Sequence, residues 1–363
     1  MRNKIMKQHI ESVIAVLCCA ALMLAMAGCK KEEPEAAADI PSSDNYSTYV
    51  FLGSDSRATG EDWKTDTETG TRGVPSSDVI MLLSVNKDTG EARIVSVYRD
   101  TMLDVAGDGS DFQKCNVAFQ RGGAYSSIDM LEKNLDTEIS GYVTANFMTV
   151  ADAIDMLGGV EVDVEDEETY ADKYKEQGLY DVVDTANRYI DELNRIYGKD
   201  TPHIEHAGLQ TLSGIQAVAY SRVRYTTGSD RRRAERQRNV VALMAEKLKT
   251  ADADTQRSVL KQMYQEVDTD LSEDELVKLF DQLIGYDLDD MGGFPYKMGN
   301  VIDEEKGNML IPCDLVTNVK ELHAFLYADE DYEPSETVKK YNDLIKEETG
   351  LDAEDADEAL STF

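Results

Sequence analysis

Two apolar runs in the first third of the chain have the pattern of neighbouring buried strands. The runs 78–86 (DVIMLLSVN) and 92–98 (ARIVSVY) carry apolar side chains at both odd and even positions. Strands with this pattern are buried on both faces. The turn residues Asp88, Thr89 and Gly90 lie between the two runs. The pattern therefore predicts a β-hairpin at the centre of a covered sheet.

Strands and amphipathic helices alternate through the rest of the chain. Helix starts are marked by Thr149, Ser213 and Ser272, each followed three residues later by Asp, Gln or Glu, as in a capping box. The alternation predicts an α/β domain with helices on both faces of a central sheet. We expect further strands at 46–53, 141–147 and 160–164, and helices at 126–136, 149–159, 213–222, 231–249 and 271–285.

The N-terminus has the features of an export signal. A basic start is followed by about sixteen apolar residues, fewer than the ~20 that a membrane-spanning helix needs. The run ends in LAMAGCKK, which resembles a lipobox and makes Cys29 a candidate for lipidation. The alternative is an uncleaved signal anchor. We therefore expect a signal segment at 1–29, an extracytoplasmic linker at 30–46, a catalytic domain at 47–330 and an acidic tail at 331–363.

Charge and cysteine content exclude several classes of protein. The formal net charge is -34, which repels nucleic acid at long range, so no nucleic-acid partner is expected. Outside the N-terminal segment only Cys115 and Cys313 remain, and they form either one disulfide or two buried free thiols. The four histidines do not form a HExxH zinc motif.

Against this acidic background, the segment from Tyr220 to Arg238 (YSRVRYTTGSDRRRAERQR) contains seven arginines. On a helix, Arg233, Arg236 and Gln237 share one face near the N-terminus, where the helix dipole favours an anion. Guanidinium groups bind phosphate oxygens in a bidentate manner, and several of them together would suit a doubly charged group such as a diphosphate. The alternative is a solvated face of Arg and Glu, to which Arg231, Arg232 and Arg238 would belong.

Carboxylates and further cations follow the predicted strands. Asp55 and Arg57 come after the first strand and Asp78 begins the next one, at strand ends where α/β proteins place ligands. Two carboxylates beside an arginine cluster suit Mg²⁺ or Mn²⁺, which bind carboxylate and phosphate oxygens together. The alternative is that both aspartates only cap turns. Arg99 and Asp100 end the hairpin, and Lys114 and Asn116 follow.

Seven segments, spread over about residues 48–250, carry the motifs described above. They are FLGSDSR, SDVIMLLSVN, VYRDT, KCNVAFQRGG, TVADAIDMLGGVEVDV, LSGIQAVAYSRVRY and DRRRAERQR. Together, and in this order, they resemble the LytR-CpsA-Psr family of bacterial cell-wall ligases. The resemblance implies a three-layer α/β/α fold with a hydrophobic pocket for a polyprenyl chain.

The resemblance also implies a set of site residues. Asp55 and Asp78 match the family's metal-binding aspartates, and Lys114 with Asn116 matches its K-x-N element. Ser76 stands where the family commonly has Arg, a place that Arg72 could fill, and Tyr98 stands where Pro is usual. The diphosphate-binding positions are Arg99, Arg222 and Arg224, and the motif D-x-x-R-x-x-R-Q is formed by Asp230, Arg233, Arg236 and Gln237.

The reaction that the resemblance implies is phosphoryl transfer. A glycopolymer, such as teichoic acid or capsule, passes from an undecaprenyl-diphosphate carrier to a peptidoglycan hydroxyl and leaves a phosphodiester link. We expect a membrane-anchored monomer at the outer face of the cytoplasmic membrane, with Asp100 and Asp230 as candidates for the general base. The alternatives are a polyprenyl-diphosphate phosphatase and a non-catalytic protein that binds lipid-linked glycan.

Overall fold

A computed structural model describes residues 45–56, 75–168, 175–224, 229–272, 275 and 291–357. The chain divides into two compact units, which we call the sheet unit and the helical unit. Within the described residues, the sheet unit comprises 45–55, 75–144 and 291–357, and the helical unit comprises Ser56 and residues from Ala145 to Glu275. The predicted signal segment, the linker up to residue 44, Cys29, Arg57 and Arg72 lie outside the described residues, and Tyr46 at the end of the predicted linker already belongs to the first strand.

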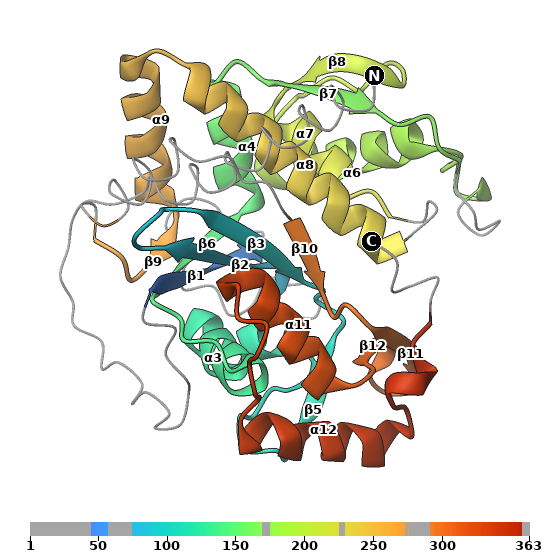
Figure 1. The fold of residues 1–363 in the computed structure, drawn as a ribbon. Coiled ribbons are helices and arrows are strands. Elements are labelled where there is room, and N and C mark those ends of the chain that lie inside the picture. Colours follow the sequence, from blue (N-terminus) through green and yellow to red (C-terminus); the bar gives the residue numbers. More distant parts are fainter. Residues whose placement is uncertain are drawn as a thin grey trace, which may run out of the picture. The chain divides into compact units, whose positions relative to one another are not determined.

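The sheet unit is built on a mixed sheet whose strands run in the order β10-β3-β2-β1-β6 (Figure 1). The predicted hairpin is confirmed, because β2 pairs antiparallel with both β1 and β3, whereas β10 is parallel to β3. The strands are β1 (Tyr46–Ser54), β2 (Ser77–Asn86), β3 (Ala92–Val97), β6 (Gly141–Asn146) and β10 (Met291–Phe294), with shorter pairs β4 (Met102–Asp104) and β5 (Phe112–Lys114), and β11 (Met298–Asp303) and β12 (Gly307–Pro312).

Helices α3 (Val117–Leu135) and α11 (Leu315–Tyr327) cover one face of this sheet (Figure 1). The shared core includes Ile80 and Leu82 of β2 and Leu131 of α3. The predicted helix at 126–136 is therefore the second half of α3, which is interrupted by non-helical backbone at Gly122 and Gly123.

The C-terminal segment is part of the core of the sheet unit. We expected residues 331–363 to form an acidic tail, helical or loose, with few apolar side chains. The helical alternative is confirmed by α12 (Glu336–Thr349), but this helix buries Val338, Tyr341 and Ile345 and packs against α3 and α11. Three apolar residues at helical spacing suffice to attach an otherwise polar helix. The expected boundary near residue 330 therefore falls inside the unit.

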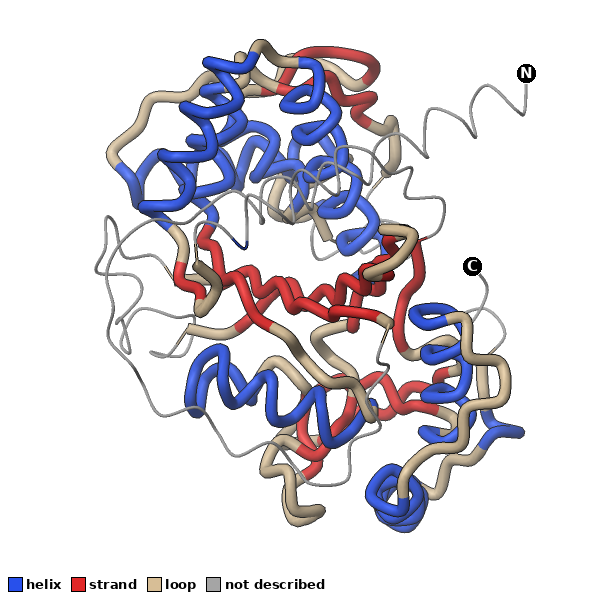
Figure 2. Tube along the Cα trace, turned by 60° about the vertical axis from the view of Figure 1, so that its left-hand side comes forward, coloured by secondary structure: helices blue, strands red, loops and turns tan. Residues whose placement is uncertain are grey.

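The helical unit contains a short antiparallel pair, β7 (Val160–Val164) and β8 (Gly208–Leu212), among helices (Figure 2). Helix α7 packs against α4 and α6, and α8 packs against α7 and β7. The remaining bounds are α4 (Phe147–Met156), α6 (Val182–Tyr197), α7 (Gly214–Ser221), α8 (Ser229–Thr250), α9 (Ala253–Glu266) and β9 (Asp268–Thr269).

The helix starts follow the sequence signals with one correction. Helix α4 is capped by Asn146, whose side chain accepts the N–H of Thr149, so Thr149 lies inside the helix and is not its cap. Ser213 caps α7 as predicted, and its N–H donates to Gln216. Ser272 and Glu275 form the predicted reciprocal pair, and the helix expected after them lies outside the described residues.

The predicted α/β class with a central mixed sheet is therefore confirmed. The hydrophobic pocket for a polyprenyl chain stays a prediction. Cys115 and Cys313 are buried free thiols, which decides between the two alternatives left open by the sequence. In the part of the chain that the structure describes, no helix combines the length and apolar character needed to cross a membrane.

Candidate functional site

In the sheet unit, the ends of β1 and β2 bring two of the predicted aspartates to one edge. Gly53 pairs with Val79 and Ser54 pairs with Ser77, so Asp78 is the extra residue of a β-bulge. Bulges re-aim side chains and are frequent beside active sites. Asp55 is the residue after Ser54 at the end of β1, and its Oδ1 accepts the N–H of Ser76 at 2.6 Å.

Arg99 connects this edge to the turn after β3. Its Nη1 donates to Asp78, and its Nε lies 3.8 Å from Oδ2 of Asp100. Oδ1 of Asp100 in turn lies 3.1 Å from Nζ of Lys114. The predicted residues Asp78, Arg99, Asp100 and Lys114 therefore form a row of alternating charge, mostly shielded from solvent. We call these four residues with Asp55 the carboxylate cluster.

The turn that carries Arg99 and Asp100 is held by groups that sequence reasoning did not assign to the site. The buried thiol of Cys115 donates to the carbonyls of Tyr98 and Arg99 at 3.3 and 3.4 Å. The N–H of Leu310 in β12 donates to the carbonyl of Asp100 at 2.9 Å. Burial, and after it the charge of Asp100, raises the pKa of Cys115, so this thiol keeps its proton. Cys115 lies inside the K-x-N element, and this position could have assigned it to the site from the sequence. No motif near Leu310 indicates that its N–H contacts the site.

Asn116, the other polar residue of the K-x-N element, is the residue before α3. It is buried, and its N–H donates to the carbonyl of Arg99 at 3.3 Å. Its backbone thus helps to fix the same turn. A contact between its side chain and a substrate stays a prediction.

The carboxylate cluster meets the chemical requirements of a hard cation only in part. Among the described residues, no group of three or more Asp, Glu, His or Cys side chains is arranged to hold a metal ion. Mg²⁺ in phosphoryl-transfer sites commonly takes one or two carboxylates and completes its shell with water and phosphate oxygens. Asp55 and Asp78 fit that kind of site, in which the substrate supplies the remaining oxygens.

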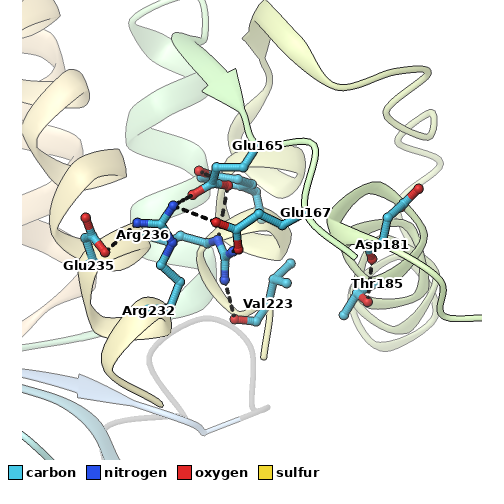
Figure 3. A network of polar contacts seen from close by, with 9 residues as sticks. Glu165, Glu167, Asp181, Thr185, Val223, Arg232, Glu235 and Arg236 are labelled. Atoms are coloured by element: carbon cyan, nitrogen blue, oxygen red, sulfur yellow. Dashed lines mark hydrogen bonds and ion pairs between the residues drawn. The ribbon is translucent and has the colours of Figure 1, made fainter. Parts of the chain in front are cut away.

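In the helical unit, arginines of the segment from Tyr220 to Arg238 form ion pairs with carboxylates of the same unit (Figure 3). Arg236 of α8 is 1% exposed, and its guanidinium lies 3.2 Å from Glu165 and 3.4 Å from Glu167, both just after β7. Its Nη1 also donates to the carbonyl of Val223 at 3.2 Å. Burial, followed by the charge of Glu165, raises the pKa of Tyr220, whose hydroxyl donates to Glu165 at 2.8 Å. Arg236 thus anchors α8 and fixes the segment between Arg222 and Arg224.

Arg232 lies at the solvent side of this network and contacts three glutamates, Glu165, Glu167 and Glu235. The alternative of a solvated face is wrong for Arg238, which is 6% exposed. Arg233, Arg236 and Gln237 are all buried, which agrees with the prediction that the three side chains share one face of the helix.

The structure describes two other predicted positions, Arg224 and Asp230, in less detail. Arg224 is partly buried at the end of the segment that Arg236 fixes through the carbonyl of Val223. Asp230 belongs to α8, and its side chain is outside the described part of the chain. Phosphate binding by the arginines of the helical unit therefore stays a prediction, and for Arg236 the observed contacts support a structural role.

Comparison with known proteins places these features in a wider group. The LytR_cpsA_psr family model matches residues 23–307 of this chain. A protein of Halalkalibacterium halodurans named polyisoprenyl-teichoic acid–peptidoglycan teichoic acid transferase TagU is 29% identical over 254 residues, which are 69% of each chain. A protein of the same name from Enterococcus faecalis is 28% identical over 56% of this chain and 57% of its own length.

Solved structures show the same fold. The crystal structure of TagV from B. subtilis matches with a TM-score of 0.57 and 20% identity, over 81% of this chain and 100% of that one. A crystal structure of a protein from Streptococcus agalactiae gives a TM-score of 0.62 and 18% identity, over 85% and 95%. A structure of TagT bound to LIIa-WTA gives 0.55 and 21%, over 79% and 92%.

Proposed function

Because this chain belongs to the LytR_cpsA_psr family, we propose that it transfers a glycopolymer from a polyprenyl-diphosphate carrier to peptidoglycan. Similar proteins carry the name of polyisoprenyl-teichoic acid–peptidoglycan teichoic acid transferases. The observation that carries the proposal is the carboxylate cluster, in which Asp78, Arg99, Asp100 and Lys114 form ion pairs and Asp55 lies at the same edge of the sheet. The reaction takes place at the outer face of the cytoplasmic membrane, where Cys29 or an uncleaved helix anchors the chain.

The transfer is a displacement at phosphorus. An acceptor hydroxyl of peptidoglycan forms a bond to the phosphorus next to the glycopolymer, and the bridging P–O bond to the polyprenyl phosphate breaks. Arg99 binds the non-bridging oxygens, where the planar guanidinium matches the phosphate geometry. Positioning and charge stabilisation supply most of the acceleration in such reactions.

Asp55 and Asp78 would hold Mg²⁺ together with oxygens of the diphosphate. A bound ion would neutralise charge on the transferring group and on the leaving phosphate. Arg99 exchanges its ion pair with Asp78 for contacts with the substrate. The main chain of Ser76 keeps Asp55 in place, through the N–H donated to Oδ1 and the Asp55 N–H donated to the Ser76 carbonyl.

Asp100 orients the cations of the site. Its carboxylate lies between Arg99 and Lys114 and holds both side chains in fixed directions. Asp100 and Asp230 are the two candidates to receive the proton of the acceptor hydroxyl. Lys114 contributes positive charge beside the transferring phosphate.

The test uses the full chain in detergent with a polyprenyl-diphosphate-linked oligosaccharide and peptidoglycan fragments, and follows products by mass. We expect a sugar-phosphate adduct that requires Mg²⁺ and falls by about 10²–10³-fold in Arg99→Ala, as for the loss of one transition-state contact. Asp78→Asn should lose the response to metal. Arg121→Ala is the matched control, because Arg121 pairs with Asp111 outside the cluster.

Two other outcomes would replace the proposal. Release of polyprenyl phosphate without an adduct, with acceptor present, would identify a phosphatase. Binding of the lipid without turnover in any condition would identify a non-catalytic glycan binder.

A further inference from the structure

Arg222 of the helical unit has an unusual environment for a side chain expected to bind an anion. Its guanidinium carbon lies 4.6 Å from the ring centroid of Phe147 and 4.6 Å from that of Tyr189. Its Nη2 lies 3.6 Å from Oε1 of Glu192. A planar cation at this distance from two aromatic rings is attracted to both.

Three helices build this arrangement. Arg222 is the C-cap of α7, and its N–H donates to the carbonyl of Ala219. Phe147 is the first residue of α4, and Tyr189 lies within α6, the two helices against which α7 packs. The positions of both rings are therefore set by packing of helix on helix.

The contacts leave one part of the guanidinium without a protein partner. Nη1 of Arg222 is buried and has no hydrogen-bond partner among the residues that the structure describes. Buried donors are nearly always paired, and an exception calls for an explanation. Glu192 lies at Nη2, so Nη1 is a buried donor that is available to a ligand.

We propose that Phe147 and Tyr189 are positioning residues that hold the plane of Arg222, so that its Nη1 edge receives an oxygen of the substrate diphosphate. This inference rests on the proposed function. A free arginine loses rotamer entropy when it binds, and a side chain already fixed by two rings loses less. The rings also exclude water, which strengthens the attraction between guanidinium and phosphate.

The test measures binding of farnesyl diphosphate to the full chain in detergent by titration calorimetry, without acceptor. We expect Phe147→Leu and Tyr189→Leu each to weaken binding by about threefold to thirtyfold, the range of a cation–π contact. Tyr189→Phe keeps the ring and should bind as the unchanged chain does. Tyr180→Leu is the matched control, because Tyr180 is exposed just before α6. Thermal unfolding of each variant identifies any loss of fold.

Arg222→Ala completes a double-mutant cycle. If the rings act through Arg222, the Leu substitutions should cause little further loss in the Arg222→Ala background. Equal losses in both backgrounds, or unchanged binding in both Leu variants with intact fold, would overturn the proposal.

Nitrogen NMR of the Arg222 guanidinium separates this proposal from the proposed function. A held guanidinium shows slow rotation about its C–N bonds, and the Leu variants should restore fast rotation. If Arg222 rotates slowly but the unchanged chain does not bind farnesyl diphosphate, the diphosphate function fails while the positioning by the rings stands. Fast rotation in the unchanged chain would refute the positioning itself.

Discussion

At the residue scale, His323 of α11 is a buried histidine that contributes to the sheet unit without belonging to the site. Its ring stacks on Tyr332 with centroids 3.5 Å apart, and its Nε2 donates to the carbonyl of Leu135 at 2.9 Å. Tyr332 and Ser335 both donate to Asp136, which follows α3. The histidine thus connects the C-terminal segment to the end of α3.

This environment predicts a pH dependence of stability. Burial lowers the pKa of His323 below its ordinary 6.5, although Leu135 and the charges of Asp136 and Asp329 oppose the shift. Below pH 6.5 the unfolded chain takes up a proton that the folded chain does not, so stability should fall as the pH falls from 6.5. We expect the unfolding midpoint to drop between pH 7.5 and 5.0, and to drop less in His323→Gln. The exposed His206 is the control, because His206→Gln should keep the full dependence; the same slope in all three proteins would contradict the role of His323.

At the element scale, α8 contains two arginines that contact the same glutamates from different depths. Arg236 is 1% exposed and Arg232 is 28% exposed, although both contact Glu165 and Glu167. Removing one partner of a buried pair leaves a charge without compensation, which costs about 3–5 kcal/mol, whereas exposed pairs contribute about 0–1 kcal/mol.

The two substitutions Arg236→Met and Arg232→Met therefore should differ in effect. We expect Arg236→Met to lower the free energy of unfolding by about 3 kcal/mol and Arg232→Met by about 1 kcal/mol or less. Urea unfolding of the full chain measures both. In Arg236→Met, added Glu165→Gln should restore part of the loss, because it removes the charge left behind. Equal losses for the two arginines would show that burial does not decide their contribution.

The same helix shows what the sequence could predict. The arginines and the helix itself follow from composition and periodicity, as the β2–β3 hairpin follows from two apolar runs and a turn. The partners of Arg236 could not be predicted, because Glu165 and Glu167 lie 71 and 69 residues away and are joined to it only by the packing of α8 on β7. The start of α4 was missed by a smaller margin, because Asn146 and Thr149 are both good caps and only the backbone distinguishes them.

The carboxylate cluster was predicted in its residues but not in its connections. Asp55, Asp78, Arg99, Asp100 and Lys114 all come from motifs that are visible in the sequence. The bulge at Asp78 and the thiol of Cys115 under the turn depend on register and packing, which local patterns do not contain.

At the scale of the whole molecule, the net charge of -34 opposes the binding of an anionic diphosphate. A cation that binds together with the substrate removes part of that repulsion. Since Asp55 and Asp78 are too few to hold Mg²⁺ alone, metal and diphosphate should each increase the affinity for the other, as linkage requires. The thermal stability of the full chain in detergent reports this coupling, because a ligand at 100 times its Kd stabilises the folded state by about 2.7 kcal/mol.

We expect millimolar Mg²⁺ alone to leave the unfolding midpoint nearly unchanged, farnesyl diphosphate in EDTA to raise it slightly, and the two together to raise it by more than the sum. Asp78→Asn should keep the effect of the diphosphate and lose the increment from the metal. Asp129→Asn is the matched control, because Asp129 lies in the sheet unit but pairs with Lys133 outside the cluster. A full shift with Mg²⁺ alone would mean that the protein holds the ion without substrate, and the metal would then have to be placed among ligands other than this pair of aspartates.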